Sequence, residues 1–131
     1  MIVVDAGAVI AVLTIPAKVP DLHQRLLHES LHVPHLLDVA VLSGLRGLSI
    51  GGKMADTAVQ AAVTDFLALD MVRHTHAPLR HRIWQLRHNA TAYDATYLAL
   101  AEALEVPLIT TDRALAGVPD VRAEVELHPH G

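Results

Sequence analysis

The segment "TAYDATYLALAEALEVPLITTD", residues 91–112, contains in order a helix start, an apolar helix, a turn and a short apolar strand. An aspartate lies near each end of the segment, Asp94 and Asp112. Aspartate is favoured at helix N-caps, and Thr91-x-x-Asp94 matches a capping box, so each aspartate taken alone is predicted to cap a helix. The segment therefore predicts a helix that leads into a strand, with a further helix after it.

The same alternation of strand and helix extends along the rest of the chain. Short apolar or alternating runs predict strands at residues 1–4, 31–34, 71–76, 106–111 and 121–127. Helical spacing of apolar residues predicts helices at residues 6–13, 20–28, 35–48, 54–69 and 92–104. Strands separated by helices favour a parallel sheet with helices on both faces, so residues 1–131 are predicted to form one α/β domain.

Composition excludes several classes of protein. The 52% apolar content fits a compact domain, but no apolar run approaches the roughly 20 residues that a membrane span needs. The chain has no cysteine, which excludes disulfides, thiolate metal sites and a cysteine nucleophile. Because the start "MIVVD" has neither the basic flank nor the cleavage site of a signal peptide, we expect a cytoplasmic protein that does not associate with membranes.

A basic stretch lies inside this acidic protein. The net charge of −4 argues against a generally sticky nucleic-acid binder, yet residues 71–93 contain no carboxylate. The basic side chains of this stretch are Arg73, Arg80, Arg82 and Arg87, with His74, His76, His81 and His88. Taken alone, the stretch is expected to be a solvated helix face. It becomes a candidate contact for phosphate groups if an acidic pocket lies nearby.

Three aspartates are predicted to meet at one edge of the sheet. Asp5 and Asp112 each follow an apolar strand directly, and the carboxyl ends of parallel strands are the edge where ligands bind. Asp94, at a helix start, is placed to face the same edge. Converging carboxylates repel one another unless a cation lies between them, and oxygen ligands suit Mg²⁺ or Mn²⁺. Such ions commonly promote phosphoryl chemistry.

The stretches "MIVVDAGAVIAVL", "LHVPHLLDVAVLSGLRGL" and "RIWQLRHNATAYDATYLALAEALEVPLITTD" resemble PIN-domain toxins of the VapC type over nearly the whole chain. The resemblance implies a three-layer α/β/α sandwich around a mainly parallel sheet. It also implies a Mg²⁺-dependent endoribonuclease that cuts structured RNA such as tRNA, a cognate antitoxin as partner, and a homodimer. An antitoxin helix is expected to bind the small, apolar surface of the helices at 6–13 and 35–48.

By position, the acidic residues that match the family's site are Asp5, Asp94 and Asp112, the expected metal ligands. Asn89 and Thr111 match positions that often support the site. Arg82 and Arg87 are the candidate contacts for the RNA backbone. The family often has serine or threonine two residues after its first aspartate, where this chain has Gly7.

The larger departure from the family is Ala40. Where the family has "LLDVEV", this chain has "LLDVAV", so the expected glutamate is missing and alanine offers no oxygen to a metal. Asp38 cannot replace it, because two residues along a helix turn the side chain by about 200°. A purely structural alternative is that Ala40 and Gly44, four residues apart, allow another element to pack closely. We favour a lost glutamate, natural or engineered, and a chain that cleaves very poorly.

Two other functions stay open at this point. A pseudonuclease would bind RNA or antitoxin without cutting, and Ala40 and Gly7 favour it. A phosphatase or other metal-dependent phosphotransfer domain is the third candidate, although a haloacid-dehalogenase-type enzyme needs an aspartate where this chain has Gly7.

Some histidines and aromatic residues outside this motif are also candidates for binding. The pairs His74-x-His76 and His128-x-His130 are minor candidates for a zinc site. Trp84 and Tyr93 could stack on an unpaired base, but core or interface packing is the favoured role for Trp84.

Overall fold

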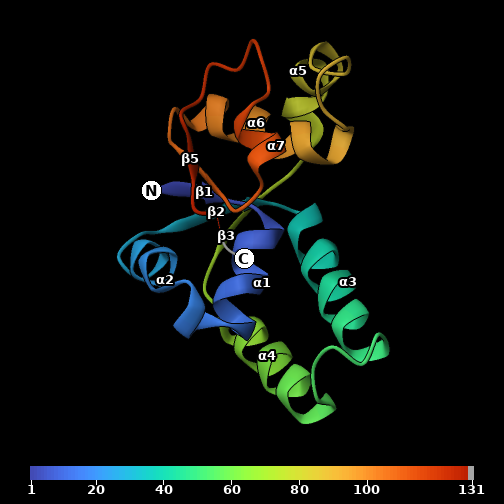
Figure 1. Ribbon diagram of the computed structural model, residues 1–131. Helices are drawn as coiled ribbons and strands as arrows, with labels where there is room; N and C mark the ends of the chain where they lie inside the picture. Colours follow the sequence, from blue (N-terminus) through green and yellow to red (C-terminus); the bar gives the residue numbers. More distant parts are fainter. Residues whose placement is uncertain (130–131) are drawn as a thin grey trace.

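The computed structural model describes residues 1–129, and its centre is a five-stranded sheet in the order β3-β2-β1-β4-β5 (Figure 1). The strands are β1 Ile2–Val4, β2 Leu31–Pro34, β3 Val72–His74, β4 Leu108–Thr110 and β5 Val125–Leu127. Every neighbouring pair is parallel, and β5 lies at an edge as its alternating sequence predicts. All carboxyl ends of the strands therefore meet on one side of the sheet.

Helices cover both faces of this sheet. They are α1 Ala6–Thr14, α2 Pro20–Leu27, α3 Leu36–Ile50, α4 Asp56–Ala68, α5 Arg80–Gln85, α6 Ala92–Leu104 and α7 Arg113–Ala116. Figure 1 shows α1 to α4 on one side of the strands and α5 to α7 on the other. The expected three-layer α/β/α sandwich is confirmed. Within residues 1–129, no helix has the length and apolar character needed to cross a membrane.

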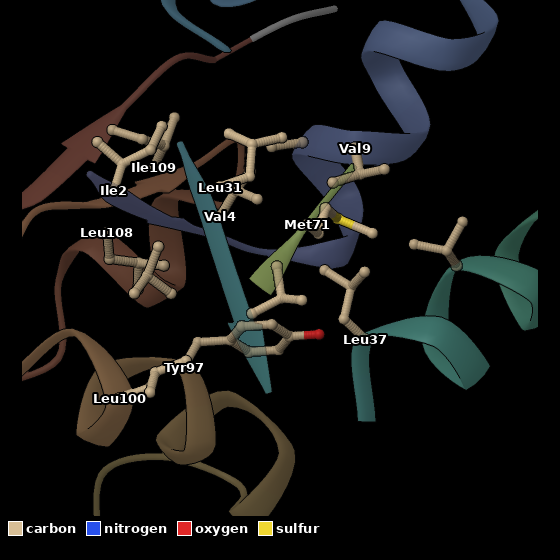
Figure 2. Packing of buried hydrophobic residues seen from close by; sticks show 14 of the residues in the cluster. Ile2, Val4, Val9, Leu31, Leu37, Met71, Tyr97, Leu100, Leu108 and Ile109 are labelled. Carbon is tan, nitrogen blue, oxygen red and sulfur yellow. The ribbon is translucent and has the colours of Figure 1, made fainter. Parts of the chain in front are cut away.

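The core is built from aliphatic side chains on both faces of the central strands. All three residues of β1 are fully buried, and so are Leu108 and Ile109 of β4. Continuous burial on both faces explains why β1 is apolar throughout and why β4 begins with two apolar residues instead of alternating. Figure 2 shows Val9 of α1 on one side of the strands and Tyr97 and Leu100 of α6 on the other.

The predicted and observed elements differ mainly at their ends. The loop expected at residues 49–53 begins later, because α3 continues to Ile50 before Gly51 caps it. The strands expected at 106–111 and 121–127 pair only over three residues each. Parallel pairing ends where the partner strand ends, and a single sequence does not show where that is.

Close packing between α1 and α3 depends on Gly44. A Cβ added at Gly44 would lie 2.4 Å from Cδ1 of Ile10, whereas one added at Gly47 would meet nothing within 4 Å. The two helices therefore pack closely at Gly44, which supports the close-approach interpretation for Gly44. The expectation that an antitoxin helix binds the remaining surface of α1 and α3 stays a prediction.

Alanine substitutions at the two glycines are expected to differ in stability. Gly47→Ala should raise the free energy of unfolding by about 1 kcal/mol, because alanine is the better helix former. Gly44→Ala should gain less or nothing, because the Ile10 side chain must rotate to make room. Urea denaturation of both variants measures the difference, and equal gains would show that the α1–α3 contact is looser than described.

Candidate functional site

The three predicted aspartates line one pocket at the carboxyl edge of the sheet. Asp5 follows β1, and Asp112 lies just beyond β4. These two strands pair in parallel, with Val3 opposite Leu108. Helix α6 packs on β1 and β4 and begins at the same edge, which brings Asp94 to the pocket. The cavity has a volume of about 550 Å³, and all three carboxylates are among its lining residues.

Asp5 is the most buried of the three, with 7% of its surface exposed. One oxygen of its carboxylate accepts a hydrogen bond of 2.9 Å from the backbone N–H of Ala8, so Asp5 caps α1. The other oxygen accepts a hydrogen bond from the Thr110 hydroxyl. Burial raises the pKa of Asp5 above its ordinary value, and the nearby charges of Asp112 and Asp94 raise it further, against the effect of the two hydrogen bonds.

Thr110 is a site residue that the sequence did not single out. Besides donating to Asp5, its hydroxyl accepts a 3.0 Å hydrogen bond from the backbone N–H of Asp112. This side chain is fully buried and connects the carboxylate of Asp5 to the backbone of Asp112. Thr111, the predicted supporting residue, lines the pocket as well. In "LITTD" both threonines are candidates, and only the register with β1 shows which one meets Asp5.

Asp112 caps a helix and also lines the pocket, whereas Asp94 lines the pocket without capping its helix. Asp112 caps α7 by accepting a 2.9 Å hydrogen bond from the N–H of Ala114. The cap of α6 is Thr91, whose hydroxyl accepts from the N–H of Asp94 at 3.1 Å, so the carboxylate of Asp94 is not used as the cap. Burial, followed by the charge of Asp112, raises the pKa of Asp94. The prediction of a helix cap is therefore confirmed for Asp112 and wrong for Asp94, because the hydroxyl of Thr91 already caps α6.

Ala40 forms part of the wall of the same pocket. It is half-buried on α3, and the cavity extends to it from the three aspartates. Asp38 is absent from the lining residues and instead forms a bidentate ion pair with Arg73, at 2.7 and 2.9 Å. Asp38 therefore does not take the place of the missing glutamate, as the helical geometry predicts.

The two remaining predicted support positions lie differently. Gly7 lines the pocket, and a Cβ there would lie 3.1 Å from Oγ1 of Thr111. Serine or threonine at position 7 would therefore crowd Thr111 unless one side chain moved. Asn89 is exposed and is not among the residues that line the cavity. The structure thus groups Gly7 and Thr111 with the aspartates and leaves Asn89 outside.

The basic stretch is largely engaged in contacts within the chain. Arg82 forms a bidentate ion pair with Glu102, at 2.7 and 3.0 Å, and donates to the carbonyl of Asp120. It therefore holds α5 against α6, away from the acidic pocket. Arg87 is exposed and lies over the ring of Trp84, 4.6 Å from its centre. Because Trp84 is 66% exposed, it does not pack in the core of this chain, and its other expected role, packing in an interface, stays a prediction.

The histidines of the first predicted zinc pair point to different partners. His74 lies 2.8 Å from the ring nitrogen of His32, and His76 accepts a 3.0 Å hydrogen bond from the backbone N–H of Leu36. They do not form a common ligand set, because each is already engaged elsewhere. The second predicted pair includes His130, which lies outside the described residues.

The chemistry of the acidic pocket fits a magnesium-type cation. Its charged lining residues are all carboxylates, with no lysine or arginine among them to neutralise them. Within residues 1–129, no three acidic or histidine side chains lie close enough together to enclose an ion by themselves. Mg²⁺ keeps several of its waters and is held by only one or two carboxylates, so it does not require such a complete cage of protein ligands.

Comparison with known proteins places this geometry in a family. The sequence profile of the PIN domain matches residues 2–121. The chain belongs to the PIN domain family. Ribonuclease VapC1 of Mycobacterium tuberculosis is 41% identical to it over 127 residues, which cover 95% of this chain and 96% of the relative. Ribonuclease VapC9 of the same organism is 37% identical over 129 residues, covering 98% and 99%. The resemblance to VapC-type ribonuclease toxins is therefore confirmed.

Solved structures show the same PIN fold at low identity. PAE2754 of Pyrobaculum aerophilum superposes with a TM-score of 0.69 and 22% identity, over 95% of this PIN domain and 81% of that chain. VapC20 of Mycobacterium tuberculosis, described as a toxin that cleaves the sarcin-ricin loop, superposes with a TM-score of 0.63 and 17% identity, over 93% and 99%. At this identity the likeness supports the fold alone.

Proposed function

We propose that this PIN domain is the toxin of a toxin–antitoxin pair, a Mg²⁺- or Mn²⁺-dependent endoribonuclease acting on tRNA or another structured RNA in the cytoplasm. The observation that carries the proposal is the convergence of Asp5, Asp94 and Asp112 on one pocket without a basic residue in its lining. The VapC-type ribonucleases among its relatives supply the substrate class.

The three aspartates of the pocket would have different roles in holding a cation. A bound cation would activate water and neutralise charge that develops on a phosphodiester. Asp94 and the free oxygen of Asp112 are the accessible ligands, while the more buried Asp5 is fixed by Thr110 and Ala8. Because the ordering hydrogen bonds exist before RNA binds, the carboxylates need little rearrangement to hold the cation.

We further propose that the chain as it stands is catalytically impaired. A glutamate at position 40 would project into the cavity from α3, opposite the carboxylates that follow β1 and β4. Alanine leaves that wall without an oxygen ligand, so both metal affinity and the position of the attacking water should suffer. The same observation favours the alternative function, a pseudonuclease that holds RNA or antitoxin without cutting.

The proposed partners are a cognate antitoxin and a second copy of this chain. A complex of toxin and antitoxin, VapBC2 of Rickettsia felis bound to a promoter DNA fragment, contains a chain that superposes with a TM-score of 0.67 and 13% identity. An apolar groove of about 360 Å³ lies between α1, α2 and α4 and is lined by Val9, Val12, Leu13, Leu26, Leu27 and Leu69 among others. This groove is a second candidate seat for an antitoxin helix, besides the surface of α1 and α3.

The test of the proposed function is incubation of total tRNA and of p-nitrophenyl phosphate with this chain, in Mg²⁺ and in EDTA. We expect slow endonucleolytic cleavage of RNA that EDTA abolishes, and no release of nitrophenol. Rapid cleavage would contradict the impairment, and binding of RNA without any cleavage would favour the pseudonuclease. Hydrolysis of the phosphoester without RNA cleavage would support the phosphatase.

Metal binding should also stabilise the fold in a pH-dependent way. The pKa values of Asp5 and Asp94 are raised above 3.8, so their ionised forms cost stability at neutral pH in the absence of metal. A cation binds only the ionised forms, and at one hundred times its Kd it adds about 2.7 kcal/mol. We expect Mg²⁺ or Mn²⁺ to raise Tm at pH 7.5, and the rise to fade as pH falls toward the raised pKa values. A metal effect on Tm that did not change with pH would argue against carboxylate ligands.

A further inference from the structure

The acidic pocket has an apolar rim that the proposed chemistry does not use. Val39 of α3 is 72% exposed and lines the pocket beside half-buried Leu36. On another wall, Tyr93 in the first turn of α6 is 73% exposed and lines the same pocket. Large apolar side chains are thus exposed to water next to a cluster of carboxylates.

The position of Tyr93 follows from the direction of helix α6. Helical side chains lean toward the N-terminus of their helix, and the N-terminus of α6 lies at the strand edge that carries the pocket. Tyr93 therefore leans over the pocket, one residue before Asp94 on the same turn. Among the hydrogen bonds of residues 1–129 there is none to the Tyr93 hydroxyl, so packing within the domain does not account for its placement.

The negative charge of the pocket limits which molecules can cover this rim. A protein that covered the rim would have to supply its own cationic side chain, because the pocket's own lining has no lysine or arginine to pair with the three carboxylates. A nucleotide brings its phosphate to the floor of the pocket, where a cation compensates the charges, and presents its base to the rim. Stacking of a base on an aromatic ring is favourable for every base.

We propose that Tyr93 is the stacking platform for the unpaired base next to the phosphate that the aspartates address, with Val39 on the opposite wall. This inference rests on the proposed function and adds to it the residue that would hold the base. The base must be free to stack, so the RNA has to be single-stranded or splayed at the cleavage point.

The experiment measures binding of fluorescein-labelled single-stranded RNA of mixed sequence by anisotropy in Mg²⁺. The variants are Tyr93→Ala, Tyr93→Phe and, as a control, Leu67→Ala, which removes an equally exposed side chain on α4 outside the pocket. We expect Kd to rise about tenfold for Tyr93→Ala and to change little for Tyr93→Phe and Leu67→Ala. A series of RNAs, each with the base removed at one position, tests this further. One RNA of the series should bind wild type and Tyr93→Ala with the same Kd.

Results that would overturn the inference are distinct from a failure of the proposed function. Equal RNA affinity of wild type and Tyr93→Ala would overturn the stacking role, while metal-dependent RNA cleavage by the chain or by its Ala40→Glu variant would still support the nuclease. If Tyr93→Ala left RNA affinity unchanged but altered the sedimentation of the chain or its antitoxin complex, the rim would be a protein interface. Absence of RNA binding and of cleavage, both for the chain and for its Ala40→Glu variant, would overturn the function and the inference together.

Discussion

An Ala40→Glu variant is expected to cleave RNA at least about a hundredfold faster than the chain with Ala40, and only when Mg²⁺ or Mn²⁺ is present. Even outer-shell partners of a metal commonly change affinity or activity by this much, and position 40 lies on the wall of the acidic pocket itself. In EDTA the same variant should be less stable than the parent, because a fourth carboxylate adds repulsion to three unneutralised charges.

Leu42→Glu is the matched control for this gain. It places the same side chain on α3, two residues further along, at a position that does not line the pocket. We expect no gain of cleavage from Leu42→Glu in a gel assay with total tRNA. If Ala40→Glu were as inactive as Leu42→Glu, the missing glutamate would not explain the low activity, and the pseudonuclease would become the better account.

Asp5→Asn, made in the Ala40→Glu background, should change activity and stability in opposite directions. Cleavage is expected to fall by about a hundredfold or more, because an amide is a poor ligand for Mg²⁺ and removes one of the charges that hold it. In EDTA at neutral pH the free energy of unfolding should rise, because burial raises the pKa of Asp5 and makes its ionised form costly. Asparagine caps helices as well as aspartate does, so α1 keeps its cap.

Chemical denaturation in EDTA and a cleavage time course in Mg²⁺ measure the two effects on the same samples. Asp70→Asn serves as the control, since Asp70 is exposed and lies outside the pocket. It should leave both cleavage and stability nearly unchanged. A loss of stability for Asp5→Asn in EDTA would show that Asp5 is a structural residue whose hydrogen bonds outweigh its desolvation.

The layers of the fold could be predicted from the sequence because each element has a clear local cause. The runs at 2–4 and 108–109 are apolar because both faces of those strands are buried. The spacing of strands and helices then requires parallel pairing. The ends of α3, β4 and β5 could not be predicted, because they depend on which partner strand or helix ends first.

The site could be predicted as far as chain direction determines it. The ends of two strands place Asp5 and Asp112 at the pocket. The helical period shows that position 40 and position 38 face different ways, and Asp38 indeed pairs with Arg73 outside the pocket. Thr110 was missed because its role comes from the lateral register between β1 and β4, which periodicity does not contain. The ion pair of Arg82 with Glu102 likewise depends on tertiary contacts, and the RNA contact expected of Arg82 stays a prediction.

The sequence also did not show the surroundings of Arg82 and Trp84, because these depend on tertiary contacts. An arginine twenty residues before a glutamate gives no sign in the sequence that the two side chains form a bidentate ion pair, as Arg82 and Glu102 do. Trp84 has apolar neighbours at helical spacing, yet α5 is so short that its outer face stays in solvent. Composition and periodicity cannot distinguish an exposed aromatic side chain from a buried one in such a helix.

Calorimetric titration with Mn²⁺ tests most directly whether the pocket is a cation site. The proteins to compare are the chain with Ala40, its Ala40→Glu variant, and a variant in which Asp5, Asp94 and Asp112 are all replaced by asparagine. We expect saturable binding by the glutamate variant, binding at least about tenfold weaker by the chain with Ala40, and none by the asparagine variant. Equal Mn²⁺ affinity in all three proteins would contradict a metal site formed by these aspartates.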